Sequence, residues 1–272
     1  MSETERRTTY THGHESTVLV SHVWRSVANS AAYLEPHLAA GTSVLDVGCG
    51  PGTITIDLAQ RVAPGRVVGL DASSEVLDLA SAAAIGAGVT NVEWVAGDLY
   101  ELPVGNDEFD IVHAHQVLQH LVDPAAALRE FARVCRPGGI IAVRDADYRA
   151  MTWFPEHPAL DAWLELYEAV ARANRAEPDA GRRLSSWALD AGLADVQASA
   201  SVWCFATPDD RAWWGGMWAE RVTDSAIGRQ AVALGLATVA DLAAMASAWH
   251  LWKDTPGAWF AVLHGEILAR PG

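Results

Sequence analysis

Residues 44–53 have the sequence VLDVGCGPGT, an apolar run that reaches Asp46 and continues into glycines at every second position. The apolar part is typical of a buried strand, and Gly48, Gly50 and Gly52 are typical of a sharp turn. Glycine is needed where the backbone takes a positive φ or where a ligand approaches the main chain. The stretch therefore predicts a strand, a ligand-binding turn and a helix.

Strands and helices alternate on either side of this turn. We predict a helix over 18–38, then strands at 43–47, 66–70, 92–95, 109–113 and 140–144, with helices at 53–61, from Ser73 to about 86, and from Asp123 to 136. This spacing favours right-handed crossovers and a parallel sheet with helices on both faces. Beyond about residue 148 we predict helices over 158–174, 181–192 and, in several pieces, 208–253, and strands at 194–205 and 259–269.

Composition limits the class of partner. The chain has 272 residues, half of them hydrophobic, and a formal net charge of -15. An acidic chain is a poor ligand for nucleic acid or an anionic membrane, so a small molecule is the expected partner. Three scattered cysteines form neither a disulfide framework nor a zinc motif. The polar N-terminus and the lack of a long apolar run favour a cytoplasmic protein, and we expect no metal.

Two segments resemble a known family. The spacing Asp-x-Gly-x-Gly-x-Gly of residues 46–52 resembles motif I of the class I S-adenosylmethionine-dependent methyltransferases. Residues 109–121, FDIVHAHQVLQHL, with RPGG at 136–139, are similar to the ubiquinone/menaquinone-biosynthesis (UbiE-like) members. A dinucleotide-binding fingerprint would place its third glycine at Thr53, so an NAD-dependent oxidoreductase is the weaker alternative.

The resemblance, which covers residues 41–145, implies the architecture. We expect a three-layer αβα Rossmann-like sandwich with a mostly parallel seven-stranded sheet, whose last strand is antiparallel and lies at the edge. One domain would include an N-terminal helical cap over 1–40, a cofactor-binding core over 41–148, and helical substrate-cap segments over 149–180 and 208–254. Residues 181–207 and 255–272 would complete the core.

The resemblance also implies a site for S-adenosylmethionine, with S-adenosylhomocysteine as product, at the carboxyl ends of the strands. Asp46 would hold the cationic amino group of the methionine moiety, directly or through water. Gly48, Cys49 and Gly50 would present their backbone to the same group. The alternative is an ordinary glycine turn in which Asp46 caps the helix.

Acidic residues also end the next two predicted strands. Asp71, followed by Ala72, occupies the position from which an acidic side chain accepts hydrogen bonds from both ribose hydroxyls. Capping of the helix at Ser73 is the alternative role for Asp71. Gly97-Asp98-Leu99 resembles the adenine-binding turn of the family. The resemblance implies, further, that backbone at Ala114 and His115 contacts the methionine part and that Gln116 and His120 lie close to the cofactor.

A general base is needed only when the methyl acceptor must lose a proton during attack. His14 and His115 are the main catalytic candidates because imidazole titrates near neutral pH. A mobile N-terminal tail is the alternative for His14. The remaining polar candidates are His12, Asp147, Tyr33 and Tyr148, together with Tyr10 and Asp145 as substrate-binding residues.

Tryptophan is unevenly distributed, because ten of twelve lie from Trp153 onward. Trp214 and Trp218 share a helical face, with Trp203, Trp249 and Trp252 as further members of the group. Such a stripe is usually core packing, and the alternative is an aromatic substrate lid. A lid would favour a planar or apolar methyl acceptor.

We therefore predict methyl transfer to a small apolar or aromatic molecule, with O-methylation first and C- or N-methylation next. A member that binds the cofactor without methylating, as a ligand sensor or a cyclase, is the alternative of a different class. The sequence leaves the oligomeric state open.

Overall fold

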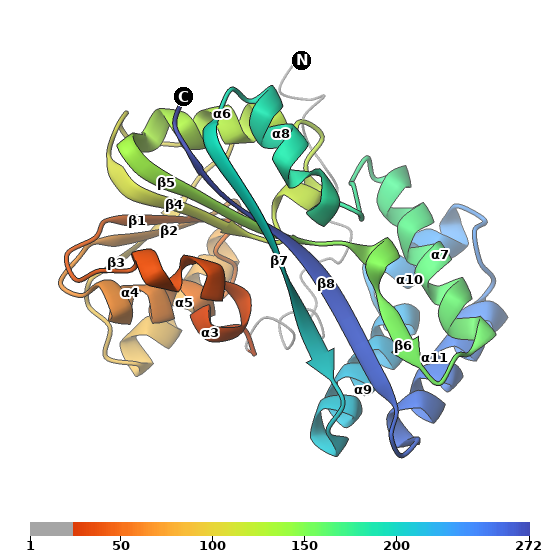
Figure 1. The fold of residues 1–272 in the computed structure, drawn as a ribbon. Coiled ribbons are helices and arrows are strands. Elements are labelled where there is room, and N and C mark those ends of the chain that lie inside the picture. The colour runs from red at the N-terminus through yellow and green to blue at the C-terminus, as the bar shows by residue number, and fades with distance from the viewer. Residues whose placement is uncertain (1–23) are drawn as a thin grey trace.

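The structure is a computed structural model and describes residues 24–272 (Figure 1). The strands of this part are β1 Val44–Val47, β2 Val67–Asp71, β3 Val92–Ala96, β4 Phe109–His115, β5 Cys135–Ala146, β6 Thr152–Phe154, β7 Ala194–Phe205 and β8 Trp259–Arg270. They form one eight-stranded sheet in the order β3-β2-β1-β4-β5-β8-β6, and β7 also pairs with β8.

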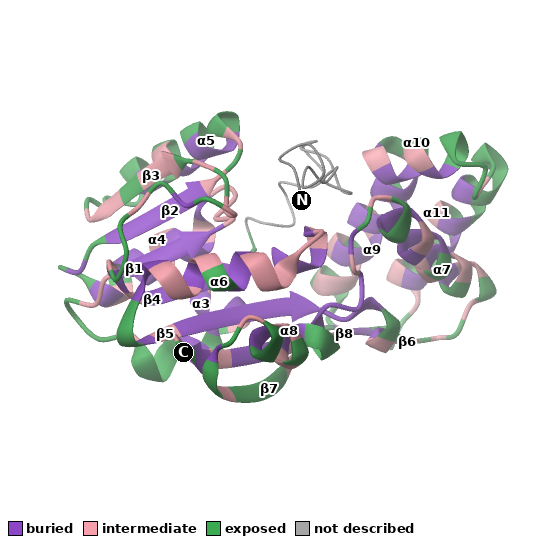
Figure 2. Ribbon diagram, turned by 90° about the horizontal axis from the view of Figure 1, so that it is seen from above, coloured by how far each residue is buried: buried purple, intermediate pink, exposed green. Residues whose placement is uncertain are grey.

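Helices cover both faces of the sheet. The α-helices of the described part are α3 Val27–Ser30, α4 Thr53–Val62, α5 Ser74–Gly86, α6 Pro124–Val134, α7 Pro158–Ala173, α8 Leu184–Asp190, α9 Pro208–Asp224, α10 Ala226–Ala233 and α11 Val239–Asp254. Short 3₁₀ helices are η1 Ala32–His37, η2 Leu118–His120, η3 Tyr148–Ala150 and η4 Gly181–Arg183. Helices α6 and α8 lie on one face and α3, α4 and α5 on the other, and the central strands between them are buried (Figures 1 and 2).

The predicted fold class is confirmed. Strands β1 to β5 pair in parallel, whereas β8 runs antiparallel to β5, β6 and β7. The predicted count of seven was one short, because the three residues of β6 are too few to show a periodicity. The last strand is also not at the edge: β5 and β6 pair with one side of β8 and β7 with the other, so β7 is the edge strand.

Two predicted helix starts are confirmed by their caps. The Ser73 hydroxyl accepts a hydrogen bond from the Val76 N–H (3.4 Å) and begins α5. The Asp123 carboxylate accepts one from the Ala126 N–H (2.9 Å) and begins α6, with Pro124 at the first helical position. The capping residues in the sequence therefore set these boundaries.

The predicted continuous helix over 18–38 is wrong in its described part. The chain makes the single turn of α3, breaks at Ala31, where φ is -144°, and continues as η1. Pro36 lies inside η1, and a proline ring in an α-helix would clash with the carbonyl four residues earlier. Residues 18–23 lie outside the described residues.

Helices α7, α9, α10 and α11 gather at the far end of β8, away from the parallel strands (Figure 1). Their shared core contains Trp163, Trp218 and Trp249, which pack against Phe260 of β8 or against each other. The helical segment predicted over 208–253 is thus confirmed as α9 to α11. None of the helices between residues 24 and 272 is both long and apolar enough to cross a membrane.

Candidate cofactor and acceptor site

The glycine turn follows β1 directly. Gly48, Gly50 and Gly52 have φ values of 69°, 55° and 80°, in the left-handed region that side chains disfavour. A Cβ on Gly48 would lie 2.5 Å from a Val117 methyl carbon, and one on Gly52 would lie 2.5 Å from the Trp94 ring. The turn therefore requires glycine for both conformation and space.

The backbone donors of this turn are bonded to β2. The Gly48 and Cys49 N–H groups both donate to the Leu70 carbonyl (2.7 and 3.0 Å), and the Gly50 N–H donates to Asp71 Oδ2 (3.0 Å). Because these N–H groups are already bonded, the turn offers a ligand mainly a backbone surface without side chains and not a set of free donors. The predicted backbone contacts of these residues with the cofactor stay predictions.

Asp46 lies beneath the turn, 3% exposed. Its Oδ2 accepts a hydrogen bond from the Thr55 hydroxyl (2.6 Å), and its Oδ1 is 2.7 Å from His113 Nδ1. Both oxygens thus already hold groups of α4 and β4. Of the two predicted contacts with a methionine amino group, this arrangement favours the indirect one through water.

Asp71 stands where β2 ends, half-buried, with both oxygens toward the neighbouring loops. Oδ2 accepts from Gly50, as above, and Oδ1 accepts from the Ser73 N–H (3.0 Å). The capping alternative is partly right, because Asp71 orders the entry to α5 while the Ser73 side chain makes the cap. Each carboxylate oxygen retains a second lone pair, so the predicted ribose contact remains available.

Asp98 lies beside Asp71 along the edge formed by the strand ends. The Gly97 N–H donates to the Asp71 carbonyl (3.1 Å), and the exposed Asp98 carboxylate accepts from the Tyr100 N–H (2.9 Å). Ala72 is also exposed, whereas Leu99 is half-buried against the core. Two accessible carboxylates on adjacent strand ends, next to a bare glycine turn, fit the hydroxyl and amino groups of a nucleoside.

Gln116 follows β4 in an unusual conformation, with φ of 54°. Such left-handed non-glycine residues are often found at functional sites. The Gln116 Oε1 accepts from Arg25 Nη2 (2.6 Å), and its Nε2 lies 2.9 Å from His264 Nε2. Gln116 therefore ties the N-terminal part of the described chain to β8 across the strand ends. Ala114, the predicted neighbour, is fully buried in the core.

His115 is buried on the sheet face that α3 covers. Burial, together with the charges of Arg25 and Arg144, holds the pKa of His115 well below its usual value. Among residues 24–272 neither ring nitrogen has a hydrogen-bond partner. The ring lies 5.6 Å from that of Trp203 and 6.1 Å from that of His264. A neutral imidazole in this position can accept a hydrogen bond from a bound hydroxyl, whereas its low pKa disfavours the uptake of a proton.

His120, the other predicted histidine, belongs to η2. Its Nε2 lies 3.1 Å from Gln119 Nε2. Burial, with a smaller effect of Arg25, lowers the pKa of His120 to about 3. The ring is therefore neutral, and its predicted proximity to the cofactor stays a prediction. His12, His14 and Tyr10 lie outside the described residues.

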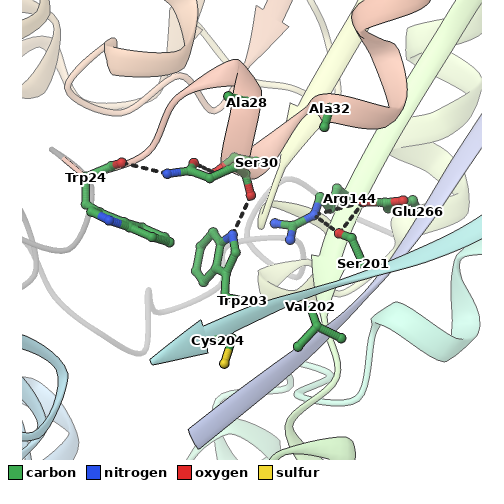
Figure 3. Close-up of a pocket in the computed structure, with 11 residues that line it drawn as sticks. Trp24, Ala28, Ser30, Ala32, Arg144, Ser201, Val202, Trp203, Cys204 and Glu266 are labelled. Carbon is green, nitrogen blue, oxygen red and sulfur yellow. Dashed lines mark hydrogen bonds and ion pairs between the residues drawn. The ribbon is translucent and has the colours of Figure 1, made fainter. Parts of the chain in front are cut away.

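Arg144 is the main residue that the sequence analysis missed. It is the Cα partner of both His115 on β4 and Glu266 on β8, and its side chain is 1% exposed. A cavity of about 300 Å³ reaches it between α3 and β7, with Trp24 and Trp203 in its walls (Figure 3). The available signal was a charged residue at the end of an otherwise apolar strand.

Asp145, predicted to bind substrate, points to the opposite side of β5 and is fully buried. Its carboxylate accepts from the Leu118 and Gln119 N–H groups (3.3 and 3.2 Å) at the start of η2. The prediction is therefore corrected: Asp145 orders the segment after β4. Asp147 is likewise occupied, by an ion pair with Arg182 (2.5 Å). Tyr148 stacks on Tyr167 with centroids 3.9 Å apart.

Burial raises the pKa of Asp145 to about 7. The folded chain then keeps a proton on Asp145 up to about pH 7, whereas the unfolded chain releases it near pH 4. The stability that is present in acid is therefore lost progressively as the pH rises from about 4 to about 7. Between about pH 5 and about pH 8 the wild type should lose roughly 2.7 kcal/mol relative to Asp145→Asn, which cannot ionise. Urea unfolding of both proteins at the two pH values measures this difference. Parallel pH profiles would contradict it.

Trp214 and Trp218 are 5% and 2% exposed in the core of the helical segment. Trp214 stacks on Phe205 (4.1 Å), and Trp218 meets Trp163 edge to face (4.5 Å). The core-packing alternative therefore describes these two residues, and the substrate-lid prediction is corrected. Trp203, by contrast, lies in the cavity wall beside Arg144.

Comparisons with known proteins agree with this geometry. A family model described as a methyltransferase domain matches residues 38–199. An uncharacterized methyltransferase of Schizosaccharomyces pombe is 34% identical over 279 residues, 99% of each chain. A demethylmenaquinone methyltransferase of Lactococcus lactis is 33% identical over 129 residues, 47% of this chain and 48% of that protein.

A solved structure shows the same fold. It is the phosphoethanolamine N-methyltransferase 2 of Haemonchus contortus in complex with phosphomonomethylethanolamine and S-adenosylhomocysteine. Its TM-score is 0.54 at 16% identity, over 86% of this chain and 50% of that one. These matches decide against the oxidoreductase alternative. The chain belongs to the methyltransferase family, and its cofactor is S-adenosylmethionine.

Proposed function

We propose that this methyltransferase acts on a small apolar or aromatic molecule, with a hydroxyl oxygen as the first candidate acceptor and carbon or nitrogen next. The observation that supports this is the cavity that reaches Arg144, the β5 neighbour of His115, and whose walls include the indoles of Trp24 and Trp203. Aromatic walls with a few polar groups are typical of sites for small planar ligands. The formal net charge of -15 and three unpaired cysteines support a cytoplasmic enzyme without a nucleic-acid partner.

The cofactor, when bound, supplies a methyl group on a positively charged sulfur, which is already activated for transfer. The chain then has to bind the acceptor, orient its nucleophile and exclude water. Asp71 and Asp98 would hold the nucleoside, and the glycine turn would lie against the methionine part. Neutral His115 would accept the hydrogen bond of an acceptor hydroxyl, which orients the oxygen for attack.

Incubation with S-adenosylmethionine and a panel of phenols, apolar alcohols and aromatic amines tests this function. We expect S-adenosylhomocysteine to form with a hydroxyl-bearing aromatic compound and not with its methyl ether, as measured by mass spectrometry. Formation with polar amines alone would contradict the proposed acceptor class. Tight cofactor binding by calorimetry without turnover on any compound would instead favour the non-methylating alternative, a sensor or cyclase.

A further inference from the structure

The cavity between α3 and β7 has the size of a site for one or two aromatic rings. Its volume of about 300 Å³ is at the lower end of the range of about 300–1,000 Å³ for small-molecule sites. The rings of Trp24 and Trp203 lie 5.1 Å apart, edge to face, on one side of it. The Trp203 indole is fixed by its Nε1, which donates to the Asn29 carbonyl (2.5 Å). A planar ligand would meet a rigid aromatic wall.

Arg144 lines the same cavity beside Trp203 and is neutralised along one edge only. Its Nε donates to the Ser201 hydroxyl (3.1 Å) and to Glu266 Oε1 (3.2 Å). The Glu266 carboxylate is itself satisfied by two serine hydroxyls, Ser201 on Oε1 (2.5 Å) and Ser199 on Oε2 (2.8 Å). These bonds hold Glu266 beside the Nε edge of the guanidinium and leave the other edge to the cavity.

The two terminal nitrogens of Arg144 are buried donors with no acceptor among the described residues. Figure 3 shows them pointing to the side where Trp203 and Ser30 lie. The Trp203 ring, 5.0 Å from the guanidinium carbon, covers one face, so the N–H groups in the plane remain for a ligand. The Tyr33 hydroxyl on η1 is another buried polar group without a hydrogen-bond partner in this part of the chain. It lies close enough to Arg144 to interact electrostatically with its charge. Buried donors are nearly always bonded, so an acceptor is expected here.

We propose that this cavity binds a planar aromatic carboxylate, whose two oxygens accept from Nη1 and Nη2 of Arg144 while its ring packs against Trp203. A guanidinium fork matches a carboxylate in geometry and charge. The nearby Arg25, 5.7 Å from the Trp203 ring, adds positive charge on the same side. This ligand would make the methyl acceptor of the proposed function an anion, and that identification of the acceptor rests on the proposed function.

Calorimetric titration with 1-naphthoate tests the site without turnover. We expect the wild type to bind 1-naphthoate at least about tenfold more tightly than its neutral isostere 1-naphthamide, because only the carboxylate is charged. Arg144→Met should reduce naphthoate affinity by about 10- to 30-fold. Arg136→Met is the matched control, since Arg136 lies near the other end of β5, is half exposed and should have no effect.

Glu266→Gln keeps the proposal testable where Arg144→Met fails to fold. It removes the competing negative charge while leaving the guanidinium, so naphthoate should bind about threefold more tightly. A purely structural Arg144–Glu266 pair predicts no gain. Equal binding of the acid and the amide, or an Arg144→Met variant that binds like the wild type, would overturn the proposal.

One further outcome would reassign the site. If saturating S-adenosylhomocysteine displaces 1-naphthoate, Arg144 holds the carboxylate of the cofactor and the proposal is wrong. Undiminished naphthoate binding in its presence supports a separate acceptor site. Naphthoate binding without methylation of any compound would leave the anion site standing while the proposed function fails, so the two failures are distinguishable.

Discussion

Asp71→Ala is expected to weaken the binding of S-adenosylmethionine by about 2–4 kcal/mol, because a carboxylate that bonds two ribose hydroxyls contributes two charge-assisted hydrogen bonds. The structure adds a reason for a large effect. Asp71 also accepts the N–H groups of Gly50 and Ser73, so its removal takes the acceptor from both groups, while the bonds of Gly48 and Cys49 to the Leu70 carbonyl remain. Calorimetric titration with S-adenosylhomocysteine measures the loss without turnover.

Ser73→Ala is the matched control for this prediction. Its hydroxyl caps α5 through the Val76 N–H (3.4 Å) but leaves the Asp71 carboxylate in place. We expect this variant to lose about 1 kcal/mol of stability and to keep its cofactor affinity. If Asp71→Ala binds the cofactor as the wild type does, Asp71 is not part of the site and acts only in ordering the loop.

The cofactor half of the molecule was largely predictable because its signals are local. A glycine turn, an acidic residue at each strand end and the caps at Ser73 and Asp123 lie within a few residues of the elements that they define. The parallel sheet then follows from the alternation of strands and helices, since crossovers have one hand. Local patterns did not reveal that the Asp46 carboxylate points inward, because its partner His113 lies on another strand.

The cavity beside Arg144, where the methyl acceptor is proposed to bind, could not be predicted in the same way. Arg144 and Glu266 are 122 residues apart and become neighbours only because β8 inserts beside β5. The serines that bond Glu266 come from β7, which is the edge strand of the sheet in place of the predicted last strand, β8. No short-range pattern encodes such a contact, so a buried ionic network at a sheet junction appears only when the register is known.

The prediction for the helical segment over 208–254 failed for a different reason, because a core helix and a substrate lid have the same sequence pattern. Tryptophans at helical spacing mark an apolar face without saying whether another helix or a ligand covers it. In the structure, α7 and α11 cover that face of α9, so Trp218 packs against Trp163 and Trp249. The tryptophan of this group that lines the cavity is Trp203, and because it lies on strand β7, a search for helical spacing does not single it out.

Trp218→Ala is therefore expected to lower the free energy of unfolding by about 3–5 kcal/mol, the usual cost of truncating a buried aromatic side chain. The lost contacts would include the Trp163 ring, the Tyr167 ring at 5.9 Å and the Arg221 guanidinium at 5.0 Å. Urea unfolding followed by circular dichroism measures the change. Trp218→Phe keeps much of the volume and removes an indole N–H that has no partner in the described chain, so it should cost far less.

The two interpretations of this residue predict opposite readouts. If α9 is part of a core, Trp218→Ala shifts the unfolding midpoint while protein that remains folded keeps its Michaelis constant for the acceptor. If α9 is a substrate lid, the midpoint stays and the Michaelis constant rises. The 2% exposure of the side chain and its aromatic neighbours on three helices make the first result the expected one. An unchanged midpoint with weakened acceptor binding would restore the lid and move the acceptor away from Arg144.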